Sequence, residues 1–332
     1  MKKRIAINGF GRIGRAVARI ILSKFSDELE LVAINDPTDS ELCAHLFQFD
    51  SNYGQFDMEV GTKDKGKIIT AKNKEIRKFS CFKISELDWE KLGIDIVIES
   101  TGLFRTKETA EEHLRVGAKK VLLSAPAKSP GFKTIVRGVN EKELKDSDAL
   151  VSNASCTTNC LAPIAQILDL NFTIQSGLMT TVHSYTNDQR ILDVGHKDFR
   201  RARAGALNII PTTTGAAKSV GLVIPQLTGK IDGISIRVPT PTVSLVDFVA
   251  TVASTPSAED INTILRQAAE KSQGILGFET RPLVSRDFLG DSRSAIVDAE
   301  QTKVTCNQIK VIAWYDNEWG YSYRLAEILQ LM

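Results

Sequence analysis

The chain has 332 residues, enough for two domains of ordinary size that each bury a core. Charged residues make up 25% of it and the formal net charge is +2, so neither an acidic tail nor the cationic excess of a typical nucleic-acid-binding protein is present. The five cysteines are an odd number, unlike a secreted disulfide framework, and no apolar stretch suits a signal peptide or the roughly 18 residues of a membrane span. We therefore expect a soluble cytoplasmic protein whose main partner is neither a membrane nor a nucleic acid.

The first half of the chain alternates short β-branched runs with amphipathic segments. Residues 4–7 and 29–35 are predicted to be strands, and residues 15–25 between them a helix. The same rhythm returns in strands at 94–100, 119–125 and 149–153 and in a helix at 106–116. Repeated βαβ units predict a parallel sheet with helices on both faces.

The second half has longer β-type runs, which predict a mixed or antiparallel sheet. They lie at residues 176–184, 233–238, 243–254 and 308–316. One clear helix is predicted at 257–271, and the chain ends in another, with Leu325, Ile328, Leu329 and Met332 at helical spacing.

A glycine motif stands between the first predicted strand and the first predicted helix. Gly9 allows a tight turn, Gly11 lets backbone approach a pyrophosphate, and Gly14 lets the helix lie close to the strand. The diphosphate would bind at the positive N-terminal end of the helix. Asp36, at the end of the second strand, is placed to bind ribose hydroxyls and to repel a 2′-phosphate. This pattern predicts a Rossmann-type domain that prefers NAD to NADP; a glycine-rich turn without a ligand is the less favoured alternative.

The stretch SNASCTTNC, residues 152–160, follows a predicted strand and begins a helix. Ser155 is expected to cap that helix, which places Cys156 in the first turn, where a thiolate is stabilised. Composition alone would favour a buried structural cysteine. A zinc site would need two ligands besides Cys156 and Cys160, and no second Cys/His cluster provides them, so no metal is expected. His183, at the end of a predicted strand, is the candidate partner of a nucleophilic Cys156.

Long motifs spread over essentially all 332 residues resemble the phosphorylating glyceraldehyde-3-phosphate dehydrogenase family. They are INGFGRIGR, SNASCTTNCLAP, TVHSYTNDQ, TTTGAAK, RVPTPTVSLVDF and WYDNEWGYS. The resemblance implies reversible, NAD-dependent conversion of D-glyceraldehyde 3-phosphate and phosphate to 1,3-bisphosphoglycerate, in glycolysis or gluconeogenesis. It implies a hemithioacetal and then a thioester on Cys156, with His183 as acid and base. The implied domains are an NAD-binding domain of residues 1–155 plus the helix 319–332, and a catalytic domain of residues 156–318.

The resemblance also implies a set of binding residues. Those for the cofactor are Asn8, Gly9, Gly11, Arg12, Ile13, Gly14, Asp36, Arg77, Ser124, Asn317 and Tyr321. Those for the attacking phosphate are Ser155, Thr157, Thr214 and Gly215; those for the substrate phosphate are Thr186, Asp188 and Arg237, with Arg201 near both. The basic segment 190–205 is implied to border a neighbouring subunit's cofactor site in a homotetramer, although alone it also fits a solvated face or a weak nucleic-acid patch.

Two departures from the strictly NAD-using members bear on cofactor choice. Pro37 stands where leucine is usual, and Val194-Gly195 stands where Leu-Pro usually crowds the 2′ position. Because Gly195 removes bulk, we expect NAD to be preferred and NADP to be tolerated. Three alternatives stay open: an NADP-preferring form of the same reaction, an erythrose-4-phosphate dehydrogenase that hydrolyses its thioester, and an NAD-binding scaffold or RNA-binding module with an inactive site. The sequence does not fix the physiological direction of the reaction.

Overall fold

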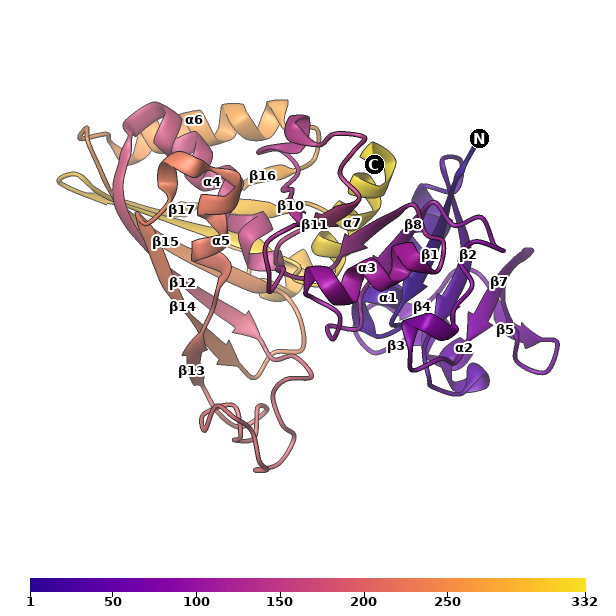
Figure 1. The fold of residues 1–332 in the computed structure, drawn as a ribbon. Coiled ribbons are helices and arrows are strands. Elements are labelled where there is room, and N and C mark those ends of the chain that lie inside the picture. Colours follow the sequence, from indigo (N-terminus) through magenta and orange to yellow (C-terminus); the bar gives the residue numbers. More distant parts are fainter. The chain divides into compact units, whose positions relative to one another are not determined.

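The computed structural model describes residues 1–332, which form two compact units. The first consists of Met1–Ile135, Lys142–Ala154 and Ser322–Met332, and the second of Val136–Glu141 and Ser155–Tyr321. Figure 1 shows a sheet and flanking helices in each. We retain residues 1–155 with 319–332, and 156–318, as the proposed functional domains.

The first unit is built on a nine-stranded sheet in the order β10-β11-β9-β8-β1-β2-β7-β6-β5. Its strands are β1 (Lys3–Asn8), β2 (Leu29–Asn35), β5 (Val60–Lys63), β6 (Ile68–Ala71), β7 (Lys74–Phe79), β8 (Ile96–Glu99), β9 (Lys120–Leu123), β10 (Lys133–Thr134) and β11 (Leu150–Ser152). A separate hairpin pairs β3 (Phe49–Asp50) with β4 (Gly54–Gln55). Pairing is parallel from β10 to β7 and antiparallel among β5, β6 and β7, so the predicted parallel sheet carries an antiparallel edge that the sequence analysis did not predict.

This unit also contains α-helices, two of which directly join neighbouring parallel strands. The helices are α1 (Arg12–Lys24), α2 (Ser40–Gln48), α3 (Lys107–Arg115) and most of α7 (Trp319–Leu331). α1 joins β1 to β2 and α3 joins β8 to β9, which are the predicted βαβ units. The side chain of Asp39 caps α2 and that of Thr106 caps α3, each by accepting backbone N–H groups of the first turn. The Rossmann-type fold is therefore confirmed.

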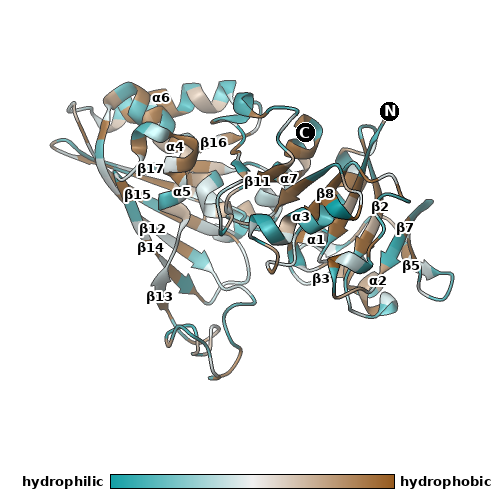
Figure 2. Cartoon of the chain, viewed as in Figure 1, coloured by the Kyte–Doolittle hydropathy of each residue, from teal (hydrophilic) through white to brown (hydrophobic).

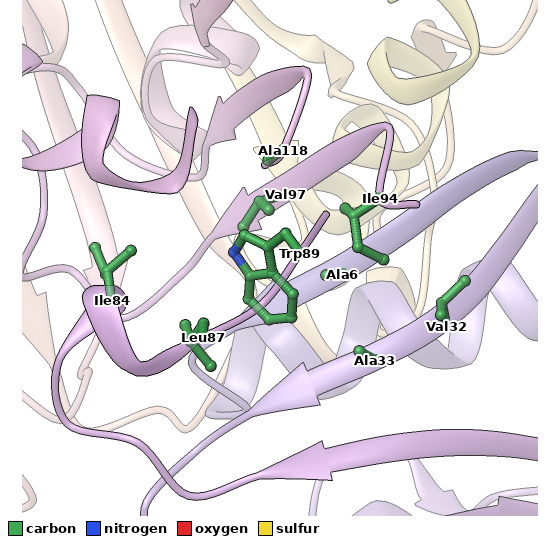
Figure 3. Close-up of a cluster of buried hydrophobic side chains, with 9 residues drawn as sticks. All are labelled: Ala6, Val32, Ala33, Ile84, Leu87, Trp89, Ile94, Val97 and Ala118. Atoms are coloured by element: carbon green, nitrogen blue, oxygen red, sulfur yellow. The ribbon is translucent and has the colours of Figure 1, made fainter. Parts of the chain in front are cut away.

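Trp89 lies at the centre of a buried apolar cluster beside this sheet. Figure 3 shows its indole ring among Val97, Ile94 and Leu87, and the ring is fully buried. The other members of the cluster are Ala6, Val32, Ala33, Ile84 and Ala118. Because Ala6, Ala33 and Val97 belong to β1, β2 and β8, the cluster packs the segment after β7 onto the middle of the sheet.

The second unit has a seven-stranded mixed sheet in the order β13-β14-β12-β15-β18-β17-β16. Its strands are β12 (Ile174–Ser184), β13 (Ile210–Thr213), β14 (Ile231–Val238), β15 (Ser244–Val252), β16 (Leu276–Glu279), β17 (Ala295–Thr305) and β18 (Gln308–Tyr315). Only β12 with β14 and β16 with β17 pair in parallel. The predicted α+β arrangement of this half is confirmed.

Three α-helices belong to the second unit: α4 (Cys156–Phe172), α5 (Ala216–Val223) and α6 (Ala258–Lys271). α4 runs through Pro163 without ending there. Ile261 and Leu265 of α6 are buried, whereas its other face is hydrophilic, as the teal residues in Figure 2 show. Every helix of the structure is too short or too polar to span a lipid bilayer.

Residues 185–209, between β12 and β13, contain no helix or strand beyond an isolated bridge between Arg190 and Ala204. We call this stretch the 185–209 segment. Six large apolar side chains on it are exposed, namely Ile191, Leu192, Val194, Phe199, Leu207 and Ile209. So many exposed apolar residues on one segment are unusual for the surface of a monomer.

Candidate active site

The start of α4 holds Cys156 at a fixed place in the second unit. Ser155 caps the helix, since its hydroxyl accepts the N–H of Thr158 at 3.0 Å, as the sequence predicted. Just before it, Ala154 has φ of 52°, in the left-handed region that few non-glycine residues adopt. The chain therefore turns sharply from β11 into α4, and Cys156 is the first helical residue.

His183 faces this cysteine from the neighbouring strand end. The distance from Cys156 Sγ to His183 Nε2 is 3.6 Å. β12 pairs in parallel with β14, and this register places His183 directly opposite Arg237. The structure thus brings together the two residues that the sequence proposed as nucleophile and base, with Arg237 beside them.

The second nitrogen of the imidazole has two neighbours. His183 Nδ1 lies 2.7 Å from the Ser184 carbonyl oxygen and 2.8 Å from Nη1 of Arg237, which can only donate. A proton on Nδ1 is donated to the carbonyl and leaves the Nε2 lone pair facing the sulfur. A proton on Nε2 faces the sulfur while Nδ1 accepts from Arg237. The same contacts therefore suit the ring as an acceptor and as a donor toward Cys156.

Burial and one cation act on both partners of this pair. The pKa of His183 is lowered to about 3, mainly by burial and further by the charge of Arg237. The hydrogen bond to the Ser184 carbonyl acts in the opposite direction and raises it. Burial raises the pKa of the Cys156 thiol above its ordinary value, and the charge of Arg237 and hydrogen bonds at Thr157 offset only part of that rise. The helix N-terminus is therefore not the sole support of a thiolate here, because Arg237 acts on it as well.

Tyr315 is a member of this site that residue-level reasoning missed, although it stands in the motif WYDNEWGYS. Its hydroxyl lies 2.9 Å from the hydroxyls of both Thr157 and Thr181, and its ring packs edge-on against His183. It therefore links the first turn of α4 to β12. Because Thr157 is 4% exposed and its hydroxyl is engaged by Tyr315, that hydroxyl is not directed at solvent.

Asn317 is held in one orientation by two hydroxyl groups. Its Oδ1 accepts from Ser184 Oγ at 2.9 Å and from Ser244 Oγ at 3.0 Å. The amide NH₂ is therefore the end left to donate to a ligand. Tyr321, at the start of α7, is buried, and burial raises the pKa of its hydroxyl well above the ordinary value.

The expected phosphate-binding residues fall into three local groups. Arg201 donates to Asp188 at 2.7 Å, to Thr212 at 2.7 Å and to the Thr213 carbonyl at 3.0 Å. Thr214 and Gly215 stand at the N-terminus of α5, where the Thr214 hydroxyl accepts the N–H of Ala216.

Arg237 forms the second group, together with Cys156 and His183. The buried Nε of Arg237 has no hydrogen-bond partner, so its N–H is a donor available to an anion. The third group is Thr186, whose hydroxyl lies 3.3 Å from the Gln189 side chain.

The first unit has a pocket of about 260 Å³ at the carboxyl ends of β1, β2 and β8. It is lined by Asn8, Gly9, Gly11, Asn35, Asp36, Pro37, Cys81, Phe82, Ile84, Ser100, Thr101, Leu103 and Phe104. Ligands of parallel α/β sheets bind at this edge. No group of three or more His, Cys, Asp or Glu side chains is placed to hold a metal ion.

The three glycines of the motif differ in what a side chain would meet. Gly9 has φ of +94°, and a Cβ there would lie 2.6 Å from the backbone nitrogen of Thr101. A Cβ on Gly14 would lie 2.2 Å from the Gly9 carbonyl oxygen, whereas one on Gly11 would meet nothing within 4 Å. Gly9 and Gly14 therefore build the turn, and Gly11 leaves open space beside the pocket, as a dinucleotide site requires.

Asp36 is fixed in the wall of this pocket by two backbone hydrogen bonds. Its carboxylate accepts the N–H of Phe10 at 2.8 Å and that of Thr38 at 2.9 Å. Burial alone would raise its pKa, but hydrogen bonds from Thr38 and Phe10 outweigh burial and lower the pKa. The group is a carboxylate at neutral pH, suited to ribose hydroxyls.

The remaining expected cofactor residues are less closely gathered. Arg77 is exposed on β7 and is not among the residues that line the pocket; the aromatic Phe82 lines it at that side instead. Arg12 and Ile13 begin α1 and are half-buried, and Arg12 pairs with Asp50. Ser124 follows β9, where its N–H donates to the Glu99 carbonyl. The apolar wall of Phe82, Leu103 and Phe104 has no periodicity or motif by which residue-level reasoning could have found it.

Comparison with known proteins decides the family. The family model described as "Glyceraldehyde 3-phosphate dehydrogenase, NAD binding domain" matches residues 3–107, and the one for the C-terminal domain matches residues 155–317. The glyceraldehyde-3-phosphate dehydrogenase of Priestia megaterium is 51% identical over 333 residues, covering 99% of this chain and 98% of that protein. The chain belongs to the glyceraldehyde 3-phosphate dehydrogenase family.

Other members are similarly close. The glyceraldehyde-3-phosphate dehydrogenase of Zymomonas mobilis is 52% identical over 330 residues, covering 98% of this chain and 97% of that protein. Glyceraldehyde-3-phosphate dehydrogenase 2 of Synechocystis is 49% identical over 332 residues, covering 99% of this chain and 98% of that protein. The predicted family, an oxidoreductase with a Rossmann-type NAD-binding domain, is confirmed.

Proposed function

We propose that the chain catalyses the reversible oxidation of D-glyceraldehyde 3-phosphate by NAD with uptake of inorganic phosphate, giving 1,3-bisphosphoglycerate. The observation that carries the proposal is the 3.6 Å approach of Cys156 Sγ to His183 Nε2 at the start of a helix. A thiol paired with an imidazole is the arrangement of a nucleophile activated by a base. Family membership supplies the substrate class.

The proposed reaction proceeds through two covalent states on the sulfur. The Cys156 thiolate adds to the aldehyde carbon and forms a hemithioacetal. Bound NAD supplies the acceptor for the hydride that leaves this carbon. His183 takes the hydroxyl proton as the carbon–oxygen double bond re-forms, which leaves a thioester. Phosphate then adds to the thioester carbon, the carbon–sulfur bond breaks, and the thiolate returns as the acyl phosphate leaves.

His183 contributes more to proton transfer than to ionising Cys156. A free thiol with a pKa near 8.5 is about 3% ionised at pH 7, so full ionisation gains roughly thirtyfold in thiolate. Lowering its pKa by about 3 units costs roughly twentyfold in nucleophilicity at a Brønsted slope near 0.45. These effects nearly cancel. General acid–base catalysis is worth about 10² to 10⁴-fold, so we assign His183 that role, with a hydrogen bond to the oxyanion.

The phosphate and cofactor residues are part of this proposal. The phosphate sites comprise Ser155, Thr157, Thr214 and Gly215 for the attacking phosphate, and Thr186, Asp188 and Arg237 for the substrate phosphate, with Arg201 near both. For Thr157 the backbone N–H at the helix start is the available donor, since its hydroxyl binds Tyr315. The cofactor set keeps Asn8, Gly9, Gly11, Arg12, Ile13, Gly14, Asp36, Ser124, Asn317 and Tyr321, with Arg77 the member that the pocket supports least.

NAD is proposed as the preferred cofactor, with NADP tolerated. Asp36 is held as a carboxylate by two backbone N–H groups and would repel a 2′-phosphate. Gly195 leaves open space, since a Cβ there would meet nothing within 4 Å. A homotetramer is proposed as well, supported by the exposed apolar residues of the 185–209 segment.

One assay tests the proposed reaction. Formation of NADH is followed by absorbance with glyceraldehyde 3-phosphate, with and without phosphate, and with NAD and NADP side by side. We expect turnover to require phosphate and kcat/KM to be higher with NAD. Sustained turnover without phosphate would instead indicate thioester hydrolysis, and a higher kcat/KM with NADP would overturn the assignment of the cofactor.

A further inference from the structure

A buried polar network that the proposed chemistry does not use lies beneath the nucleotide pocket. Its centre is Glu99, the last residue of β8, whose side chain is fully buried. Thr101 donates to Glu99 Oε1 through its N–H at 2.8 Å and through its hydroxyl at 2.5 Å. Glu99 Oε2 lies 2.6 Å from Asn8 Nδ2 and 3.1 Å from His113 Nε2. Every oxygen of this carboxylate therefore faces two donors.

Trp89 decides which nitrogen of His113 carries the proton. The indole Nε1, drawn blue in Figure 3, can only donate, and it lies 3.0 Å from His113 Nδ1. His113 Nδ1 must accept, so the proton of the neutral ring is on Nε2 and is donated to Glu99. With both residues fully buried, the tautomer is locked from one side by Trp89 and from the other by the carboxylate.

Two arms of this network end in the walls of the nucleotide pocket. Through Thr101, Glu99 holds the loop after β8, and the Thr101 hydroxyl accepts the N–H of Leu103 at 3.0 Å. Ser100 in the same loop donates to the Gly9 carbonyl at 2.7 Å. Ser100, Thr101 and Leu103 all line the pocket.

The other arm runs from Glu99 across the strand ends. Asn8 Oδ1 accepts from Asn35 Nδ2 at 2.7 Å. Asn35 in turn accepts the N–H of Cys81 at 2.9 Å and donates to its carbonyl at 3.0 Å. Cys81 and the adjacent Phe82 form the pocket wall on that side. One buried carboxylate is therefore linked by hydrogen bonds to the loop after β8 and, through Asn8 and Asn35, to Cys81 after β7.

We propose that Glu99 and His113 are positioning residues that hold the walls of the pocket in the conformation that binds the adenosine half of the cofactor. That half suits this pocket because Asp36 can bind ribose hydroxyls, and Pro37, Leu103 and Phe104 offer apolar surface to a flat base. The inference rests on the proposed use of NAD. Neither residue touches the cofactor; both act through Thr101, Asn8 and Asn35.

Glu99→Gln is the variant that breaks this network at constant size. In one orientation the amide NH₂ opposes the backbone N–H of Thr101, and in the other it opposes the donors of Asn8 and His113. His113 cannot adapt by changing its tautomer, because its Nδ1 would then oppose the N–H of Trp89. Since the unsatisfied buried group no longer holds the pocket walls in place, we expect Kd for ADP and KM for NAD to rise roughly five- to tenfold.

The decisive comparison is between cofactor binding and the other kinetic constants. With Glu99→Gln, kcat at saturating NAD and KM for glyceraldehyde 3-phosphate should stay within about twofold, since no contact of the network reaches Cys156. Glu30→Gln is the matched control: this exposed carboxylate on β2 pairs only with Arg4, and its loss should leave every constant unchanged.

A second variant tests the inference if Glu99→Gln does not fold. Thr101→Val replaces the hydroxyl with a methyl group and so removes one hydrogen bond to Glu99, while the bond from the Thr101 N–H to Glu99 persists. It should therefore weaken ADP binding severalfold. Variants that melt at a lower temperature but bind ADP like the wild type would overturn the inference and leave the network a role in stability alone. Failure of the wild type to bind ADP or NAD would overturn the proposed function together with it.

Discussion

His183 reaches three groups through two ring nitrogens: the sulfur of Cys156, the carbonyl of Ser184 and the guanidinium of Arg237. If proton transfer is its main task, His183→Asn should lower kcat by about 10² to 10⁴-fold and slow alkylation of Cys156 by iodoacetamide far less. Steady-state turnover and alkylation rates measured on the same preparation give the comparison. His45→Asn, an exposed histidine of the first unit, is the control. Alkylation that falls as far as turnover would make His183 chiefly a generator of thiolate.

Arg237 sets the charge around Cys156. Burial raises the pKa of the Cys156 thiol and the guanidinium charge of Arg237 opposes this rise, so removal of that charge should raise the pKa further and leave less thiolate at neutral pH. In a His183→Asn background, where the imidazole no longer titrates, Arg237→Gln should shift the midpoint of the alkylation–pH curve to higher pH. Iodoacetamide is neutral, so the lost charge does not alter its attraction to the site. Arg203→Gln, whose exposed side chain pairs with Asp193, should leave the midpoint in place; an equal shift there would deny Arg237 this role.

At the scale of elements, two glycines in the turn from β1 into α1 are expected to affect different properties, Gly14 the stability of the protein and Gly11 the binding of the cofactor. In Gly14→Ala the new Cβ would lie 2.2 Å from the Gly9 carbonyl, so the free energy of unfolding should fall by about 1–3 kcal/mol. In Gly11→Ala the Cβ meets no protein atom, so stability should change by less than about 1 kcal/mol. In the proposed cofactor site the same methyl group would face the pyrophosphate, so Kd for NAD should rise about tenfold. Urea unfolding and calorimetric titration measure both; normal NAD binding by Gly11→Ala would contradict this account of the pocket.

The elements themselves were largely predictable, because each depends on local periodicity and capping. The βαβ rhythm predicts β1, α1 and β2, and Ser155 marks the start of α4, as the structure confirms. The antiparallel edge of β5, β6 and β7 was missed because its strands are short and two are partly exposed. For such strands the choice between loop and ladder depends on a partner strand rather than on the sequence of the strand itself.

The sites were predictable only in part, for a similar reason. Resemblance to a family identified Cys156 and His183, whereas composition alone favoured a structural cysteine. The network around Glu99 joins Asn8 to His113 across 105 positions, and no spacing rule connects residues so far apart. The apolar wall with Phe82 likewise depends on how the loop after β7 meets the loop after β8, which the sequence pattern does not encode.

For the whole molecule, the 185–209 segment predicts assembly. Ile191 and Phe199 are 86% and 88% exposed, more than a stable monomer is expected to leave on one segment. We expect the wild type to sediment as a tetramer and Ile191→Asp/Phe199→Asp to form smaller species, because a buried charge disfavours the interface. Val284→Asp, an exposed apolar residue outside the segment, should remain tetrameric. A monomeric wild type, or a double variant that stays tetrameric, would disprove this use of the segment.

The most direct test of the central claim is to trap the covalent intermediate. The protein is mixed with glyceraldehyde 3-phosphate and NAD without phosphate, quenched in acid and digested, and its peptides are weighed. We predict a phosphoglyceroyl thioester on the peptide that contains Cys156, its loss on addition of phosphate, and no adduct or turnover in Cys156→Ser. An adduct on another residue, or a Cys156→Ser variant that turns over normally, would contradict the account.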